Sequence, residues 1–399
     1  MRANVVRRKL IKPCTPTPKN LKNYKISCID ELAPSTNIGV LLFYPPKPGR
    51  IIQKLEESLQ KILPQFYVLA GRYIKTNHSI NCGDEGVEFV EAEAADDELP
   101  DIVGTSEQLN DLLPRRSYQM DGELDPLLSV QITDLKCGGL VIGVSVSHRI
   151  FDTCSLATFI AAWSNASSSS AENISTVIPS FDESTALFPG RHWSKVECSR
   201  MEGHGIVCRR FCFNKEAIDR LRSKLGPEDG KLKVSKVLVV SAVIAKALIG
   251  RSRDYYISHA VNMRGRTIPP MQKHACGNLV LQALSSCVAE VEMGTQELVN
   301  LMDEAIGKAI SKCGQLSLGG ATLKPVANAL PEASTTAVWF SDWSKFGFCD
   351  IDFGQGKPVW VGIAPMHAQD TTILMGNRDG DGIEAWVHLT KDDMKLFET

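Results

Sequence analysis

The feature that most constrains the fold is a short apolar run that ends in a histidine. Leu140–Val146 is rich in β-branched residues and follows two glycines, which predicts a strand buried on both faces. His148 comes two residues after the end of this strand, and from Leu156 apolar residues recur at helical spacing. Asp152 or Thr153 occupies the position of a helix N-cap. His148 is therefore predicted to lie at a rigid corner between a core strand and a helix.

An imidazole at such a corner is suited to general-base catalysis, because its unperturbed pKa is about 6.5. The spacing itself is a weak pattern, since a histidine four residues before an aspartate also arises by chance in a chain of 399 residues. On this pattern alone, a catalytic histidine and a structural one are both open.

Length, composition and charge narrow the class of protein. A chain of 399 residues suits two domains or one large one, and 43% hydrophobic with 23% charged residues is ordinary for a soluble globular protein. The net charge of -2 gives no electrostatic reason to expect a nucleic-acid partner. No apolar run is long enough to span a bilayer, and residues 1–12 lack the apolar segment of a signal peptide. A cytoplasmic protein without a membrane partner is predicted.

The twelve cysteines are scattered, and many lie in apolar or strand-like surroundings. They show no paired CxxC spacing of the kind that holds zinc. Reduced, structural thiols and no metal site are therefore predicted.

Strands and helices are mixed in both halves of the chain. The stretch 187–205 combines proline, glycine, histidine and charge without periodicity, and we interpret it as a crossover between domains 1–186 and 206–399. The serine-rich residues 164–170 are predicted to be exposed. Apolar periodicity and capping residues predict helices over 52–63, 215–224, 236–249, 298–310 and 391–397.

Two motifs resemble the signatures of one enzyme family. His148 to Asp152 and the segment Asp352-Phe353-Gly354-Gln355-Gly356 resemble the HxxxD and DFGWG motifs of the plant BAHD acyltransferases. Residues 11–18 resemble the vinorine synthase-like group of alkaloid acetyltransferases within that family. Further similar segments cover nearly the whole chain, at Leu69–Arg72, Asn262–Arg264, Ser341–Trp343 and Gly382–Trp386.

The resemblance implies a fold and a reaction. The fold is α/β, with two chloramphenicol-acetyltransferase-like domains, each a mixed β-sheet with flanking helices, and a tunnel between them. The protein would be a monomeric acyltransferase with acyl-CoA as co-substrate, an alcohol as acceptor and no permanently bound cofactor. The domain 1–186 would carry HxxxD, and the domain 206–399 would carry DFGQG.

The same resemblance implies roles for individual residues. His148 would take the proton of the acceptor hydroxyl and return it to the CoA thiolate, without a covalent acyl-enzyme. Trp343 is the candidate donor to the oxyanion with Ser341 beside it, although a plain core aromatic is equally open. Ser235 at a helix N-terminus, Ser341 and Lys357 are candidate CoA contacts.

The acidic motif residues are expected to be structural. Asp152 is expected to form a salt bridge with Arg264, and the alternative is that it orients the imidazole of His148. Asp352 and Gly354 are expected to shape the chain near the CoA channel.

The predicted function is acetyl transfer to a hydroxyl of a plant specialised metabolite, either an alkaloid or a terpenoid. The alternative is malonyl or longer-chain acyl transfer to a glycoside or sugar. It is less favoured for anthocyanins, because residues 274–278 differ from the YFGNC segment of many anthocyanin malonyltransferases. A third hypothesis is an inactive binding protein of the same fold. Gln355 in place of the usual Trp favours it, and the intact His148 and Asp152 argue against it.

Overall fold

The computed structural model describes residues 3–49, 51–94, 106–117, 119–168, 177–192, 205–225, 234–249, 255–287, 293–316 and 336–398. The chain divides into two compact units. The first comprises Met1–Cys198, Gln272–Asn278 and Phe346–Met366. The second comprises Ser199–Met271, Leu279–Lys345 and His367–Thr399. The segment that carries Asp352 and Gly354 therefore belongs to the first unit by its contacts, although it is late in the sequence.

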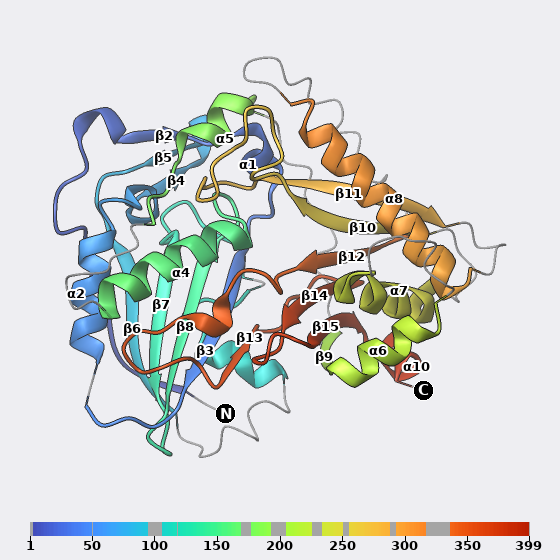
Figure 1. Ribbon diagram of the computed structural model, residues 1–399. Coiled ribbons are helices and arrows are strands. Elements are labelled where there is room, and N and C mark those ends of the chain that lie inside the picture. The colour runs from blue at the N-terminus through green and yellow to red at the C-terminus, as the bar shows by residue number, and fades with distance from the viewer. Residues whose placement is uncertain are drawn as a thin grey trace. The chain divides into compact units, whose positions relative to one another are not determined.

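The first unit is built on a six-stranded sheet, visible in Figure 1. Its central strands β3 and β8 are buried at every residue, as expected of the apolar run at 140–146. β6 and β7 run parallel, and the other neighbours pair antiparallel. In order across the sheet, the strands are β1 (Ala3–Ile11), β6 (Val87–Ala94), β7 (Leu128–Asp134), β8 (Leu140–Ser147), β3 (Asn37–Tyr44) and β13 (Trp360–Gly362).

Two helices, α2 (Ile52–Ile62) and α4 (Thr153–Ser168), lie side by side on this sheet (Figure 1). Trp163 joins them, because its indole Nε1 donates to the carbonyl of Leu55 at 3.1 Å and to Ser58 Oγ at 3.0 Å. The predicted exposure of residues 164–170 is wrong for Ser164 and Ser167, which are buried. α4 continues through them, and their hydroxyls bond to backbone carbonyls. Residues 169–170 lie outside the described residues.

Shorter elements complete the first unit. A three-stranded sheet has the order β2 (Asn23–Lys25), β5 (Ser79–Asn81) and β4 (Arg72–Ile74). The helices are η1 (Lys19–Leu21), α1 (Cys28–Leu32), η2 (Tyr67–Ala70), η3 (Lys75–Asn77), η4 (Ser106–Leu112), α5 (Asp182–Leu187) and η6 (Phe348–Asp350).

The second unit has its own six-stranded sheet. β10, β12 and β14 run parallel, whereas β11, β15 and β9 pair antiparallel with their neighbours. The order is β11 (Val280–Cys287), β10 (Tyr255–Asn262), β12 (Thr336–Asp342), β14 (Thr371–Gly376), β15 (Ile383–Thr390) and β9 (Ile206–Phe213). The helices are α6 (Lys215–Ser223), α7 (Lys236–Ile249), α8 (Thr295–Cys313) and α10 (Lys391–Phe397).

Most predicted helices are confirmed to within a few residues, together with their capping residues. Asn214 caps α6 through a bond from the N–H of Ala217 at 2.9 Å, and Ser235 caps α7 through a bond from the N–H of Leu238 at 3.1 Å. Strand β11 was not predicted. It lies at the edge of its sheet and buries only alternate residues, so its apolar signal is weak.

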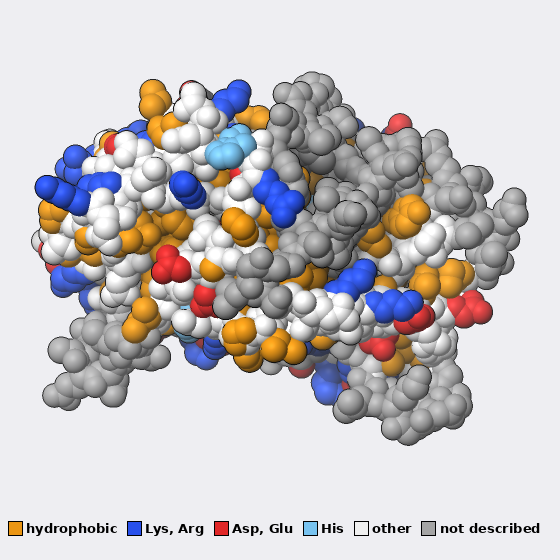
Figure 2. All heavy atoms as spheres, turned by 90° about the horizontal axis from the view of Figure 1, so that it is seen from above, with side chains coloured by type: hydrophobic (Ala, Val, Ile, Leu, Met, Phe, Trp, Pro, Cys, Tyr) orange, Lys and Arg blue, Asp and Glu red, His pale blue; other side chains and the backbone are white. Residues whose placement is uncertain are grey.

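The face drawn in Figure 2 shows no dominant charge among the described residues. On the face drawn in Figure 2, basic, acidic and apolar side chains are interspersed, in keeping with the net charge of -2. Within the described residues, no helix has both the length and the apolar character needed to cross a membrane.

Two histidines are buried in the second unit. His259 of β10 stacks on Phe340 with ring centroids 4.9 Å apart, and neither of its nitrogens has a hydrogen-bond partner among the described residues. Burial lowers the pKa of His259 to about 4. His388 of β15 is also fully buried, and burial lowers its pKa to about 4. Both side chains are therefore neutral in the folded protein at neutral pH.

Replacing His259 by phenylalanine should reduce the loss of stability in acid. The pKa of His259 is about 4 when folded and about 6.5 when unfolded, so the unfolded chain takes up the proton first. Stability is complete above pH 6.5 and falls as the pH decreases toward 4. From the size of this shift, we expect the free energy of unfolding of His259→Phe to fall by about 3 kcal/mol less than that of wild type over this range. Urea titrations at a series of pH values measure this effect. The control is His192→Gln, which changes an exposed histidine. If the free energies of unfolding of wild type and His259→Phe changed with pH in parallel, the prediction would be contradicted.

Candidate active site

The backbone of His148 is held on both sides. Its N–H donates to the carbonyl of Thr36 at 2.8 Å, and its own carbonyl accepts a bond from Asn278 Nδ2 at 2.8 Å. Asn278 is fixed in turn, because its N–H and its Nδ2 both donate to Oδ1 of Asp30 at 2.8 Å. The direction in which the imidazole leaves the backbone is thereby determined.

The imidazole of His148 is half-buried as a residue, but its Nδ1 is fully enclosed. This nitrogen has no hydrogen-bond partner among the described residues. Burial lowers the pKa of His148 below its usual value, and the nearby carboxylate of Asp152 opposes part of that shift. The ring is therefore neutral at neutral pH, which is the form that accepts a proton.

Asp152 is the N-cap of α4. Its Oδ1 accepts bonds from both the N–H and the hydroxyl of Ser155, each at 2.8 Å. The same hydroxyl accepts a bond from the N–H of Gly277 at 3.1 Å. The predicted cap at residue 152 or 153 is thus Asp152, and it ties the start of α4 to the segment that carries Asn278.

Asp352 organises the loop around it. Its Oδ1 accepts the N–H groups of Gly354 at 2.7 Å and Gly356 at 2.8 Å. Both glycines have positive φ, +89° and +85°, a conformation that side chains disfavour. Phe353, between Asp352 and Gly354, is fully buried and packs against Trp163 with ring centroids 4.7 Å apart.

The two motifs lie at opposite ends of α4. Asp152 precedes its first residue, whereas Ser167, near its end, donates to the carbonyl of Phe353 at 3.3 Å. Fifteen residues of α-helix span about 22 Å, so the segment around Asp352 is far from His148. Among the described residues, the hydrogen bonds of Asp352 are with Gly354 and Gly356 of its own loop and not with His148.

Gln355 of this loop lines a hollow of about 360 Å³ at the surface of the first unit. Lys47 and Asp134 line the same hollow. Lys357 is exposed and pairs with Asp350, its Nζ lying 2.7 Å from Oδ1.

The remaining predicted site residues belong to the second unit. The indole N–H of Trp343 donates to Oγ of Ser341 at 2.9 Å, so these two side chains are hydrogen-bonded to each other. The hydroxyl of Ser235 caps α7, as described above. The guanidinium of Arg264 donates to Asn262 Oδ1 at 3.1 Å.

Sequence reasoning missed two carboxylates near the histidine. Asp30 has a local signal, because Ser27 and Asp30 form a capping box at the start of α1. Asp121 has none, because it lies in a loop and its contacts with the end of β8 arise only in the folded chain. Of the described residues, no group of three or more His, Cys, Asp or Glu could hold a metal ion.

Comparisons with known proteins identify the family. A model described as "Transferase family" matches residues 1–399. This chain belongs to that family. It is 41% identical to a pelargonidin 3-O-(6-caffeoylglucoside) 5-O-(6-O-malonylglucoside) 4'''-malonyltransferase of Salvia splendens, over 100% of this chain and 98% of the relative. It is 33% identical to vinorine synthase of Rauvolfia serpentina, over 98% of this chain and 95% of the relative.

Solved structures agree with this assignment. The crystal structure of vinorine synthase is 31% identical and matches with a TM-score of 0.85 over 99% of this chain and 96% of that one. F. graminearum TRI101, complexed with coenzyme A and deoxynivalenol, is 17% identical and shares the fold with a TM-score of 0.69, over 94% of this chain and 96% of that one. The predicted α/β fold with two sheet-rich domains is confirmed, as is the membership of the plant BAHD acyltransferases. The protein is an acyltransferase.

Changing Asp152 to alanine should destabilise the protein through the lost cap. We expect the free energy of unfolding to fall by at least about 1–2 kcal/mol, because the N–H of Ser155 loses its acceptor. Asp152→Asn keeps an acceptor oxygen for this N–H and should lose less stability than Asp152→Ala.

Urea unfolding measures these losses, and Asn214→Ala, which removes the cap of α6, is the matched control. An Asp152→Ala protein as stable as wild type would contradict the capping role. A loss of about 3–5 kcal/mol would show that, beyond the lost cap, a buried charge is left without its partner.

Proposed function

We propose that this acyltransferase moves an acyl group from a CoA thioester to a hydroxyl group, with His148 as general base. The observation that carries the proposal is an enclosed, neutral imidazole on a backbone fixed by Thr36 and Asn278. A base must stay unprotonated and keep its position until the acceptor arrives, and the lowered pKa and the hydrogen-bonded backbone of His148 support both requirements.

In the proposed reaction, His148 takes the proton of the acceptor hydroxyl as its oxygen attacks the thioester carbonyl. A tetrahedral oxyanion forms, the carbon–sulfur bond breaks, and the imidazolium returns the proton to the departing CoA thiolate. The acyl group passes directly between the two substrates, so no acyl-enzyme is required.

Ser341 is the proposed oxyanion donor, and Trp343 is proposed to support it. Because the indole N–H already donates to Oγ of Ser341, the hydroxyl of Ser341 can turn its own proton toward the developing charge. In this arrangement Trp343 polarises Ser341 rather than contacting the oxyanion itself.

We further propose structural and binding roles for the remaining residues. Asp152 pairs with Arg264 in addition to capping α4, so that removing both side chains costs less than the sum of the two separate losses. Ser235 and the first turn of α7 bind a phosphate of CoA, with Lys357 as a further contact. Asp352 and Gly354 are structural. The protein acts as a monomer in the cytoplasm.

The proposed donor is acetyl-CoA, and the proposed acceptor is an alkaloid or terpenoid alcohol. This choice is supported by vinorine synthase and by a stemmadenine O-acetyltransferase of Catharanthus roseus, which is 33% identical over 99% of this chain. A limonoid 21-O-acetyltransferase of Melia azedarach is also 31% identical over 100% of this chain.

A second candidate is malonyl transfer to a glycoside. The relative from Salvia splendens favours it, because its 41% identity exceeds that of these acetyltransferases. The difference between residues 274–278 and the YFGNC segment argues against malonyl transfer, but it is a weaker argument than identity over the whole chain. Both acetyl-CoA and malonyl-CoA are therefore tested as donors.

The replacement of His148 by alanine should lower turnover by about 10²–10⁴-fold, because it removes the general base. The melting temperature should change little, since the bonds at this corner use the backbone of residue 148 and not its ring. Steady-state rates with a saturating acyl-CoA measure the loss, and His192→Ala, at an exposed histidine, is the control. Turnover within about threefold of wild type would refute the role of His148.

A panel of donors and acceptors tests the reaction itself. Acetyl-CoA and malonyl-CoA are each incubated with alkaloid alcohols, terpenoid alcohols and glycosides, and products are identified by mass spectrometry. Acetylated alcohols are expected, and exclusive malonylation of glycosides would establish the second candidate. Absence of product from every pair would indicate the inactive binding protein.

The intact protein, incubated with acyl-CoA alone, should keep its mass. An acyl adduct on Cys154 or another residue would show that the mechanism is covalent.

A further inference from the structure

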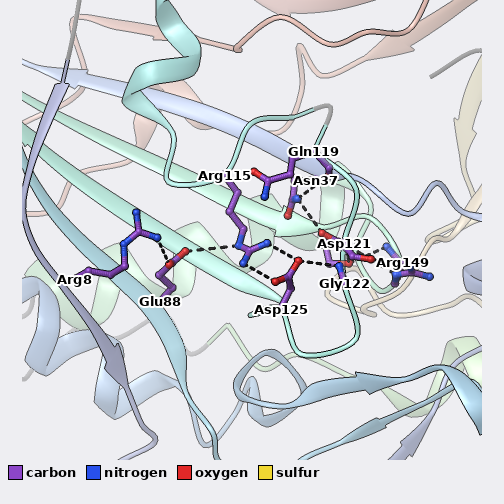
Figure 3. Close-up of polar contacts among 10 residues, drawn as sticks. Arg8, Asn37, Glu88, Arg115, Gln119, Asp121, Gly122, Asp125 and Arg149 are labelled. Atoms are coloured by element: carbon purple, nitrogen blue, oxygen red, sulfur yellow. Dashed lines mark hydrogen bonds and ion pairs between the residues drawn. The ribbon is translucent and has the colours of Figure 1, made fainter. Parts of the chain in front are cut away.

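One carboxylate reaches the residues on both sides of His148. Asp121 lies in the loop between η4 and β7, and its side chain points toward Asn37 and Arg149 (Figure 3). Its Oδ2 accepts a short hydrogen bond from the hydroxyl of Ser147, and its Oδ1 accepts one from Asn37 Nδ2 at 2.9 Å.

Arg149 is attached to the same residue. Its Nη2 donates to the backbone carbonyl of Asp121 at 3.3 Å, and its Nε lies 4.0 Å from Oδ2. Its guanidinium also stacks on Tyr73, 4.4 Å from the ring centroid, and its side chain is only 11% exposed. These contacts restrain the side chain of Arg149 and, with it, the backbone of residue 149.

The loop that carries Asp121 is itself anchored. The N–H of Asp121 donates to the carbonyl of Ser35 at 2.8 Å, and Asn37 is the strand partner of Ser147 in the pairing of β3 with β8. Asp121 thus connects the start of β3 to residues 147 and 149, which flank the histidine directly.

Burying the carboxylate of Asp121 at the end of a strand costs desolvation free energy. The side chain of Asp121 is 3% exposed, and burial raises its pKa to about 6 despite bonds from Ser147 and Asn37 and the charges of Arg149 and Arg115. Buried ion pairs contribute little net stability compared with apolar packing, so stability alone does not account for Asp121.

We propose that Asp121 is a positioning residue that fixes the orientation of the His148 imidazole by holding Ser147 and Arg149. This inference rests on the proposed role of His148 as general base. Asp121 touches neither substrate nor imidazole in this scheme, and it acts on the rate through the histidine alone.

Changing Asp121 to asparagine tests the proposal, because it keeps the size of the side chain and removes its charge. We expect kcat to fall by about tenfold to 100-fold, the effect of a small displacement of a catalytic group. The KM for acyl-CoA should stay within about twofold, since acyl-CoA binding is not involved.

Asp125→Asn is the matched control on the same loop. Asp125 bonds to Arg115, with distances of 2.9 Å and 2.8 Å, and to the N–H of Gly122 at 2.8 Å (Figure 3). Among the described residues, the hydrogen bonds and ion pairs of Asp125 do not involve residues 147–149, so its variant should keep the wild-type kcat. Equal losses in both variants would overturn the positioning role.

Repeating the Asp121→Asn change in the His148→Ala variant distinguishes a positioning role from a general loss of structure. In His148→Ala, the further change Asp121→Asn should alter the residual rate by less than about twofold, because the group that it positions is gone. The same fold-loss in both backgrounds, or a wild-type kcat for Asp121→Asn alone, would overturn the proposal. Wild-type turnover of His148→Ala would instead refute the general base and leave Asp121 with nothing to position.

Ser147→Ala covers the case in which Asp121→Asn does not fold. It removes the short bond to Asp121 and leaves every charge in place. A loss of kcat of about threefold or more that disappears in the His148→Ala background supports the proposal, and an unchanged kcat overturns it.

Discussion

The structure of the first unit depends on the restraint of one peptide segment, residues 147–149. The amide of His148 is bonded to Thr36 and its carbonyl to Asn278, so two segments distant in sequence fix the same residue. Strand β8 can then end abruptly and α4 can begin within a few residues. Side chains are directed well only when their backbone is restrained, and here hydrogen bonds on both sides of residue 148 supply that restraint.

Three carboxylates surround this segment, and most of their bonds go to the protein backbone and to neutral side chains. Asp30 holds Asn278 and Ser27, Asp152 holds the start of α4, and Asp121 holds Ser147. Burial raises the pKa of Asp30 to about 6, as it does for Asp121. Several donors to each carboxylate offset the cost of removing it from water. Burial lowers the pKa of His148, so its imidazole is neutral at neutral pH although this region also contains negative charge.

Much of the fold could be predicted from local sequence. The apolar run at 140–146 and the helical spacing after Leu156 give the strand, the corner and α4, because each depends on neighbours in sequence. The buried serines of α4 and the edge strand β11 could not be found this way. Serines in a helix look the same in sequence whether the helix buries them or exposes them. A strand that buries only alternate residues has too few apolar residues to stand out from a loop.

The same distinction applies to the candidate site. His148, Asp152 and Asp352 stand in recognisable motifs, so they could be singled out before the structure was known. Asp121 and Asn278 owe their places to contacts between segments far apart in the chain, and no spacing rule connects them to residue 148. For Asp352, the motif drew attention to a residue whose bonds turn out to shape its own loop.

The late segment Phe346–Met366 in the first unit has a consequence for the order of events during synthesis. Strand β13 pairs with β3, whose Leu41, Leu42 and Phe43 are fully buried in the finished protein. Until about residue 362 has left the ribosome, this edge has no partner strand and presents an open row of backbone groups. The first unit therefore cannot finish folding before the late segment has been synthesised. A nascent chain that stalls within the second unit would leave the edge of β3 unpaired and open to aggregation.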